Sequence, residues 1–235
     1  MTERKIGPLI DGWVPPPVPG GVELQGRFVR LEPLDPARHA APLFAAFAGH
    51  DWIWDYMGNG PFATVADLQA GLAEIGQGHP TYVVCPQGQV PLGFACYWTV
   101  APAMGSTEVG SITFSPALQR SPATTEAMFL MMQHAFALGY RRYEWKCNAL
   151  NLPSRRAAQR LGFSYEGIFR NHMVIKGRSR DTAWFAMTDQ DWPALQRAFE
   201  IWLDPANIGS DGQQRQTLAS LTAPCLLARD PDQPL

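Results

Sequence analysis

The chain is poor in cysteine and in charged residues, and it has no long apolar run. Its four cysteines lie far apart with no CxxC pair, which disfavours a zinc site or a disulfide framework and favours reduced thiols. A net charge of -2 and the lack of a basic stripe argue against a nucleic-acid partner. No segment approaches the roughly 18 apolar residues of a membrane span, and no apolar stretch follows Met1–Lys5 as in a signal peptide. These absences favour a cytoplasmic protein with no membrane partner.

Hydrophobic residues make up 46% of the 235 residues, which is enough to bury a core without covalent staples. The first 21 residues are rich in proline and glycine, so 1–21 is predicted to be an extended arm. The pattern changes at Val22, and we expect one globular domain over 22–203. Residues 204–235 are polar with scattered apolar positions, and they are predicted to form a weakly ordered tail.

Hydrophobic periodicity predicts alternating strands and helices within that domain. Methionines at helical spacing begin at Met128, and they are more typical of core packing than of a cofactor site. Such an order of elements argues for an α/β or α+β sheet covered by helices. A first strand or hairpin is predicted over 22–31. Further strands are predicted over 81–85, 92–100, 108–114, 142–147, 163–170 and 182–187, and helices over 36–48, 64–76, 122–138, 152–161 and 191–203.

Three segments resemble motifs of one enzyme superfamily: Glu108–Pro116, Gln119–Ala127, and the Asn-x-x-Ser of Asn151–Ser154 followed by Leu161-Gly162-Phe163. Together they resemble the GNAT N-acetyltransferases, in the branch of ribosomal-protein-alanine and small-amine acetyltransferases (RimJ/RimL-like). The resemblance implies a mixed, mostly antiparallel central sheet of six to seven strands flanked by helices. It also implies that strands four and five splay apart to admit acetyl-CoA.

The second segment corresponds to the family's pyrophosphate loop. A helix N-terminus offers free N–H groups and a positive dipole end, which suits a phosphate. Gln119 matches the family pattern Q/R-x-x-G-x-G/A, but Pro122 and Thr124 replace its glycine and its glycine or alanine, so one N–H is lost. Ser121-Pro122 could equally be a helix cap with a first-turn proline. The resemblance implies that the cofactor is bound by Ile112, Phe114, Gln119, Arg120, Ser121, Ala123, Thr124, Asn151 and Ser154.

Asn151 and Ser154 allow two interpretations each. Asn151 is either a helix cap or, as the resemblance implies, a contact to the pantetheine arm. Ser154 is either a solvated first-turn serine or a hydroxyl that protonates the leaving thiolate. The tyrosine that many relatives use for that step, seven residues after the asparagine, is replaced here by Ala158.

Glu108, on the predicted fourth strand, is the candidate base for the amine, although a glutamate on a strand is more often solvated. Glu144 and Asp181 are weaker candidates, and His134 and His172 have no partner at catalytic spacing.

Two further features are predicted to be structural or to form part of the acceptor site. Glu126 near its helix start is predicted to be structural. An aromatic segment between the first two helices either lines the acceptor pocket or packs on the sheet; it contains Trp52, Trp54, Tyr56 and Met57.

We therefore expect an enzyme that transfers an acetyl group from acetyl-CoA to a primary amine by direct attack, with no metal. The acceptor is expected to be a protein N-terminus or a small amine. One alternative is a non-catalytic acyl-CoA-binding or sensor protein on the same fold. Another is a fold used for subunit association, as in a homodimer, with the arm 1–21 as a docking strap.

Overall fold

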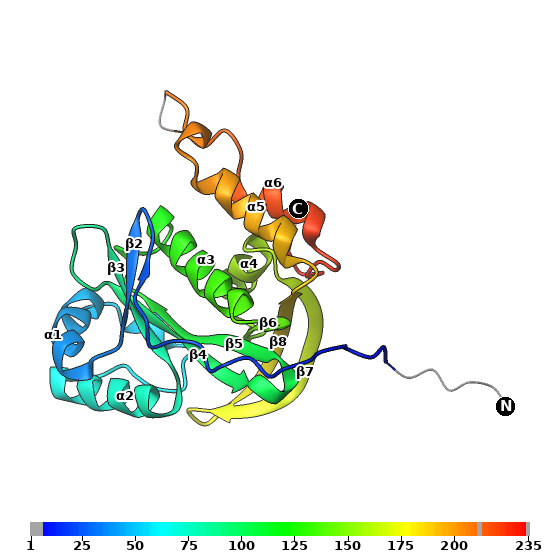
Figure 1. The fold of residues 1–235 in the computed structure, drawn as a ribbon. Helices are drawn as coiled ribbons and strands as arrows, with labels where there is room; N and C mark the ends of the chain where they lie inside the picture. The colour runs from blue at the N-terminus through cyan, green and yellow to red at the C-terminus, as the bar shows by residue number, and fades with distance from the viewer. Residues whose placement is uncertain (1–6, 211–212, 234–235) are drawn as a thin grey trace.

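A computed structural model describes residues 7–210 and 213–233. Its centre is one eight-stranded sheet in the order β1-β2-β3-β4-β5-β6-β8-β7 (Figure 1). Every neighbouring pair is antiparallel except β5 and β6, so the predicted mixed, mostly antiparallel sheet is confirmed. The strands are β1 Leu24–Gln25, β2 Val29–Pro33, β3 Thr81–Pro86, β4 Gly93–Ala101, β5 Ser106–Phe114, β6 Arg142–Asn148, β7 Ser164–Ile175 and β8 Arg178–Thr188.

Helices cover both faces of the sheet: α1 and α2 lie on one side, and α3 and α4 on the other (Figure 1). Their starts are set by side-chain caps, such as Asp35 before α1 and Thr64 before α2. Within the described residues, no helix has the length and apolar character needed to cross a bilayer. The α-helices are α1 Pro36–Phe47, α2 Val65–Gly78, α3 Pro122–Ala137, α4 Leu152–Arg160, α5 Trp192–Leu203 and α6 Leu218–Thr222, and the short 3-10 helices are η1 Asp51–Trp54, η2 Pro102–Met104, η3 Pro205–Asn207 and η4 Ala223–Cys225.

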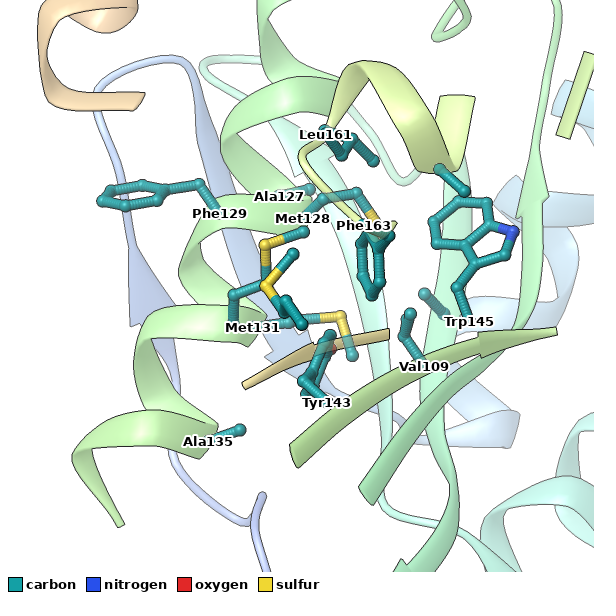
Figure 2. Close-up of a cluster of buried hydrophobic side chains, with 14 of the residues drawn as sticks. Val109, Ala127, Met128, Phe129, Met131, Ala135, Tyr143, Trp145, Leu161 and Phe163 are labelled. Atoms are coloured by element: carbon teal, nitrogen blue, oxygen red, sulfur yellow. The ribbon is translucent and has the colours of Figure 1, made fainter. Parts of the chain in front are cut away.

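The larger core lies between α3 and the central strands. Figure 2 shows Met128 and Met131 of α3 beside Tyr143 of β6 and Phe163. Met131 is fully buried, so this methionine stripe packs the core as its spacing predicted. A second core under α1 and α2 covers the other face of β3 and β4. All six residues of β3 are buried, which is typical of a strand covered on both faces.

The first predicted element, a strand or hairpin, is a hairpin of β1 and β2, and the sheet therefore has eight strands and not six to seven. Glu126 of α3 anchors its turn, because its carboxylate accepts the backbone N–H groups of Arg27, Phe28 and Val29 at 2.8, 2.5 and 3.0 Å. A side chain at Gly26 would place Cβ 2.4 Å from the Glu126 carboxyl carbon. Glu126 is therefore structural, through the turn that it holds.

The described part of the N-terminal arm, residues 7–21, lies against its own domain. Pro16 and Pro19 are buried. The Gly20 N–H donates to His134 Nε2 at 3.2 Å, and the Arg141 guanidinium lies over the Trp13 ring at 6.0 Å. His134 is thus a structural acceptor that holds the arm, and burial lowers the pKa of its imidazole.

The segment 204–235 differs from the weakly ordered tail expected from its polarity. In its described residues, α6 packs on α4 and α5, and Leu218 is buried. Thr222 Oγ1 donates to the Arg160 carbonyl at 3.0 Å. The prediction of a weakly ordered tail was wrong for two reasons. The few apolar residues of this segment are spaced to face α5, and its buried Asp230 pairs with Arg155 of α4, 75 residues earlier in the chain. The described residues of this segment form a layer over α4 and α5.

Candidate active site

A cleft of about 1420 Å³ opens where β5 and β6 separate. Their parallel pairing runs from Ser106 opposite Arg142 to Val109 opposite Trp145 and then stops, although both strands continue. The predicted splay between strands four and five is therefore confirmed at β5 and β6. Beyond Val109, the edge of β5 that faces β6 has no strand partner in the described chain.

A bulge in β5 accompanies the separation. In the antiparallel pairing with β4, Phe94 faces Thr113 and Cys96 faces Gly110, so two residues of β5 lie opposite one residue of β4. Ser111, one of these two, has a left-handed φ of 48°. A bulge of this kind bends and twists its strand, so it turns the end of β5 away from β6.

Glu108 lies on β5 where the paired stretch ends, and it is 5% exposed. Its Oε2 accepts the Thr99 hydroxyl at 2.8 Å and lies 2.9 Å from Lys146 Nζ. Lys146 also lies 3.3 Å from Glu144 Oε2 and 4.1 Å from the centre of the Trp184 ring. Because these contacts use Oε2, Oε1 is the carboxylate oxygen left for a proton.

The first turn of α4 forms one wall of the cleft. Asn151 Oδ1 accepts the Ser154 N–H at 3.2 Å, so Asn151 does cap the helix. Ser154 Oγ accepts the Trp145 indole N–H at 3.0 Å, and the Ser154 hydroxyl also interacts with the Cys147 thiol. Ala158 is fully buried in the core. Cys147 also lines the cleft, and burial raises the pKa of its thiol.

The N-terminus of α3 forms the opposite wall. Ser121 is its N-cap: Oγ accepts the Thr124 N–H at 3.3 Å and donates to the Leu118 carbonyl at 2.6 Å. Gln119 Nε2 donates to the Phe114 carbonyl at 2.9 Å. The cap interpretation of Ser121-Pro122 is thus confirmed, and the cap uses the Thr124 N–H.

The loop still offers donors to an anion. Among the described residues, the backbone N–H groups of Arg120, Ser121 and Ala123 have no protein acceptor. Arg120 has a left-handed φ of 57°, which turns the chain immediately before the helix. Successive N–H groups in such a turn form a concave anion site. The loop therefore fits a phosphate group despite its proline.

Arg160 at the end of α4 was not identified from the sequence. Its Nη1 donates to Thr125 Oγ1 at 3.2 Å, and its guanidinium lies 5.4 Å from the Trp202 ring centre. It forms no ion pair within the described chain, and burial lowers its pKa. A half-buried guanidinium without an anion beside a helix N-terminus fits the phosphates of coenzyme A. The sequence feature that could have identified Arg160 is its spacing of four residues from Arg156, which puts both on one helix face. Both arginines line the cleft.

The aromatic segment before α2 both lines the cleft and packs in the core. Trp52, Tyr56 and Met57 line the cleft, whereas Trp54 is 3% exposed and its ring meets Phe47 edge-to-face, with 5.5 Å between centres.

Two hydrogen bonds join this segment to the other walls. Tyr56 Oη donates to the Leu150 carbonyl at 3.3 Å, and Lys176 Nζ of the β7–β8 hairpin donates to the Trp54 carbonyl at 3.0 Å. The segment therefore bridges both sides of the cleft.

The other sequence candidates divide into two groups. Asp181 accepts the Asn171 N–H at 2.6 Å and so stabilises the β7–β8 hairpin. His172 lines the cleft with Nδ1 3.0 Å from Thr182 Oγ1. Of the predicted site residues, all but Ala123 line the cleft; they are Glu108, Ile112, Phe114, Gln119, Arg120, Ser121, Thr124, Asn151 and Ser154.

Comparisons with known proteins agree with this geometry. A structure of a GCN5-related N-acetyltransferase from Brucella melitensis is 44% identical, covers 91% of this chain and all of its own, and superposes with a TM-score of 0.87. A structure of a probable GNAT-family acetyltransferase from Chromobacterium violaceum is 41% identical, covers 83% and 100% of the two chains, and has a TM-score of 0.78.

More distant structures share the fold alone. An acetyltransferase from Salmonella typhimurium that modifies the N-terminal serine of ribosomal protein L7/L12 is 17% identical, covers 69% and 96% of the two chains, and has a TM-score of 0.61. A search of curated proteins found no match.

The acetyltransferase (GNAT) domain family matches residues 29–164, which is more than half of the chain. The chain therefore belongs to the GNAT acetyltransferase family, whose members are acetyl-CoA-dependent acyltransferases.

Proposed function

We propose that this protein acetylates a primary amine by direct attack on acetyl-CoA. The observation that carries the proposal is the position of Glu108, a buried carboxylate at the point where β5 and β6 separate. An amine is protonated near neutral pH and must lose a proton before it can attack a carbonyl carbon. Glu108 Oε1 is free of protein contacts among the described residues, and it takes that proton directly or through a water molecule.

We propose that the cofactor lies along the α3 and α4 walls of the cleft. Its phosphates are held by the loop from Gln119 to Thr124 and by Arg160, because these supply free N–H groups and an unpaired guanidinium. The pantetheine arm then runs between β5 and β6, past Ile112, Phe114 and Asn151. Acetyl-CoA supplies an activated acetyl group as its thioester. The unpaired edge of β5 offers backbone N–H groups that polarise the carbonyl.

Ser154 is proposed to donate its hydroxyl proton toward the departing sulfur. Its Oγ already accepts the Trp145 indole N–H, and this contact directs the hydroxyl proton away from Trp145. The raised pKa of the Cys147 thiol supports direct attack, since a neutral thiol is a poor nucleophile for a covalent acetyl-enzyme. Much of the acceleration is expected from holding the amine and thioester together.

The test is an amine screen. Purified protein is incubated with acetyl-CoA and a panel of small amines, amino acids and peptides, and free thiol is measured together with the mass of the N-acetylated product. Thiol release that depends on the amine, with a product heavier by one acetyl group, supports the proposal. Thiol release without any acetylated amine, or no turnover although coenzyme A binds, would contradict amine acetylation.

A further inference from the structure

The cations of the cleft fall into two groups. Arg120, Arg156 and Arg160 surround the wall formed by α3 and α4, where phosphates are expected. Arg180 comes from β8, and Lys146 from β6, beside Glu108. The second group lies where an acceptor amine must react.

Lys146 and Arg180 differ in their partners. Lys146 is neutralised by Glu108 and Glu144, at 2.9 and 3.3 Å. Arg180 forms no ion pair within residues 7–210 and 213–233, and its only side-chain hydrogen bond there runs from Nε to Thr182 Oγ1 at 3.2 Å. Its terminal N–H groups are thus left for a partner from outside the chain.

Arg180 is also close to the reacting centre. It is half-buried, and burial lowers the pKa of its guanidinium, while electrostatic interactions with Cys147 and Glu108 act in the opposite direction. Both of these groups line the splay between β5 and β6. A half-buried arginine without an anion has lost hydration that no protein group replaces, and a carboxylate matches its planar donors in a bidentate pair.

Part of the same cleft is apolar and aromatic, and Met173 of this part lies opposite Arg180 in the β7–β8 pairing. The Trp98 ring stacks on His79 with 4.0 Å between centres, and Trp98 is 41% exposed within the cleft. Met173, also 41% exposed, lines the same space. Such a surface suits an apolar side chain of a small ligand.

We propose that Arg180 binds a carboxylate of the acceptor, so that the substrate is an amino acid with an apolar or aromatic side chain. This inference rests on the proposed function. In the productive arrangement, the amine faces Glu108, the carboxylate faces Arg180, and the side chain lies toward Trp98. A protein N-terminus has no carboxylate close to its amine, so it leaves Arg180 unpaired.

The experiment compares three acceptors of one shape: L-phenylalanine, its amide, and phenethylamine. The wild-type protein is expected to prefer L-phenylalanine over both uncharged analogues by at least about tenfold in kcat/KM, because a site built for a charged group penalises its absence. Arg180→Gln should remove this preference, mainly by raising KM for L-phenylalanine, and should leave KM for phenethylamine unchanged. Arg178→Gln, an exposed arginine two residues earlier on the same strand, is the matched control and should keep the preference.

A cooperative melting transition without ligand shows that each variant is folded, and coenzyme A binding is then measured by the thermal shift that the ligand causes. Equal use of the three acceptors by the wild-type protein would overturn the inference, as would efficient acetylation of peptide N-termini alone, and both results would leave amine acetylation intact. A loss of coenzyme A affinity in Arg180→Gln, with acceptor preference unchanged, would assign the arginine to the cofactor and overturn the inference as well. If no amine in the panel is acetylated, the proposed function itself fails together with the inference.

Discussion

Arg155 of α4 and Asp230 form an ion pair in the protein interior, with 2.7 Å between Nε and Oδ2 and side chains that are 3% and 0% exposed. Arg155 Nη1 also donates to the Ala149 carbonyl at 2.9 Å, in the loop that leads to Asn151. The C-terminal segment is thereby connected to the α4 wall of the cleft.

Replacement of Asp230 by Asn should therefore destabilise the fold. Removing one partner of a buried pair leaves an uncompensated charge, which costs about 3–5 kcal/mol. We expect a loss near the lower end of that range in urea unfolding, because Asp232 and the Ala149 carbonyl remain as partners. Asp232→Asn is the control, since its side chain is 60% exposed and such pairs contribute about 0–1 kcal/mol. Equal losses in the two variants would contradict this account.

The role proposed for Glu108 predicts that its replacement lowers kcat without changing the affinity for coenzyme A. Glu108→Gln keeps the shape of the side chain but cannot take a proton, so kcat should fall by about 10²-fold or more. Coenzyme A affinity, measured by calorimetry, should be unchanged. Glu144→Gln is the matched control, because Glu144 also contacts Lys146 but does not line the described cleft. If both variants lose the same activity, the Lys146 pair rather than a base at Glu108 is responsible.

Arg160 is predicted to recognise the phosphates of the cofactor. Arg160→Gln should weaken coenzyme A binding by about tenfold, in line with the loss of a charge-assisted hydrogen bond, about 1.5–3 kcal/mol. Affinity for pantetheine, which lacks the nucleotide, should not change. Arg197→Gln, an exposed arginine on α5, serves as the comparison. A parallel loss of affinity for both ligands would place Arg160 outside the phosphate site.

Two histidines, the buried His39 and the half-buried His134, predict a loss of stability in acid. Burial lowers the pKa of His134 and of His39 from the ordinary value of 6.5. Below that value the unfolded chain takes up protons that the folded histidines resist, so stability is complete above pH 6.5 and declines as the pH falls toward the folded pKa values. Protonation of His134 also removes the acceptor of the Gly20 N–H.

His134→Gln tests the contribution of His134 to this loss of stability in acid, because a glutamine oxygen can accept the Gly20 N–H and does not titrate. Melting temperatures measured on both sides of pH 6.5 should fall less steeply for this variant than for the wild-type protein. An identical slope would assign the acid sensitivity to other groups.

Most of the fold could be predicted from sequence because its signals are local. The methionine spacing of α3 and the caps at Ser121 and Asn151 depend on neighbours within one or two helical turns. The cofactor wall was predicted from the same short motifs. In the described chain, those motifs lie at the separation of β5 and β6.

The parts that were missed depend on contacts distant in sequence. Lys146 reaches Glu108 only because β5 and β6 pair in parallel. Arg160 and Arg180 look like ordinary surface arginines in the sequence, and only the fold shows that they are half-buried without an anion. The ordered segment after α5 was missed for the same reason, since its polar residues find their partners on α4.

The 75 residues that separate Arg155 from Asp230 also set an order of events during synthesis. A ribosome adds about 5–20 residues per second, so the arginine emerges roughly 4–15 s before the carboxylate that neutralises it. During that interval α4 carries the charge of Arg155 without Asp230, the carboxylate that neutralises it in the folded interior. The wall that presents Asn151 and Ser154 to the cleft is therefore completed late, after the central sheet has been made.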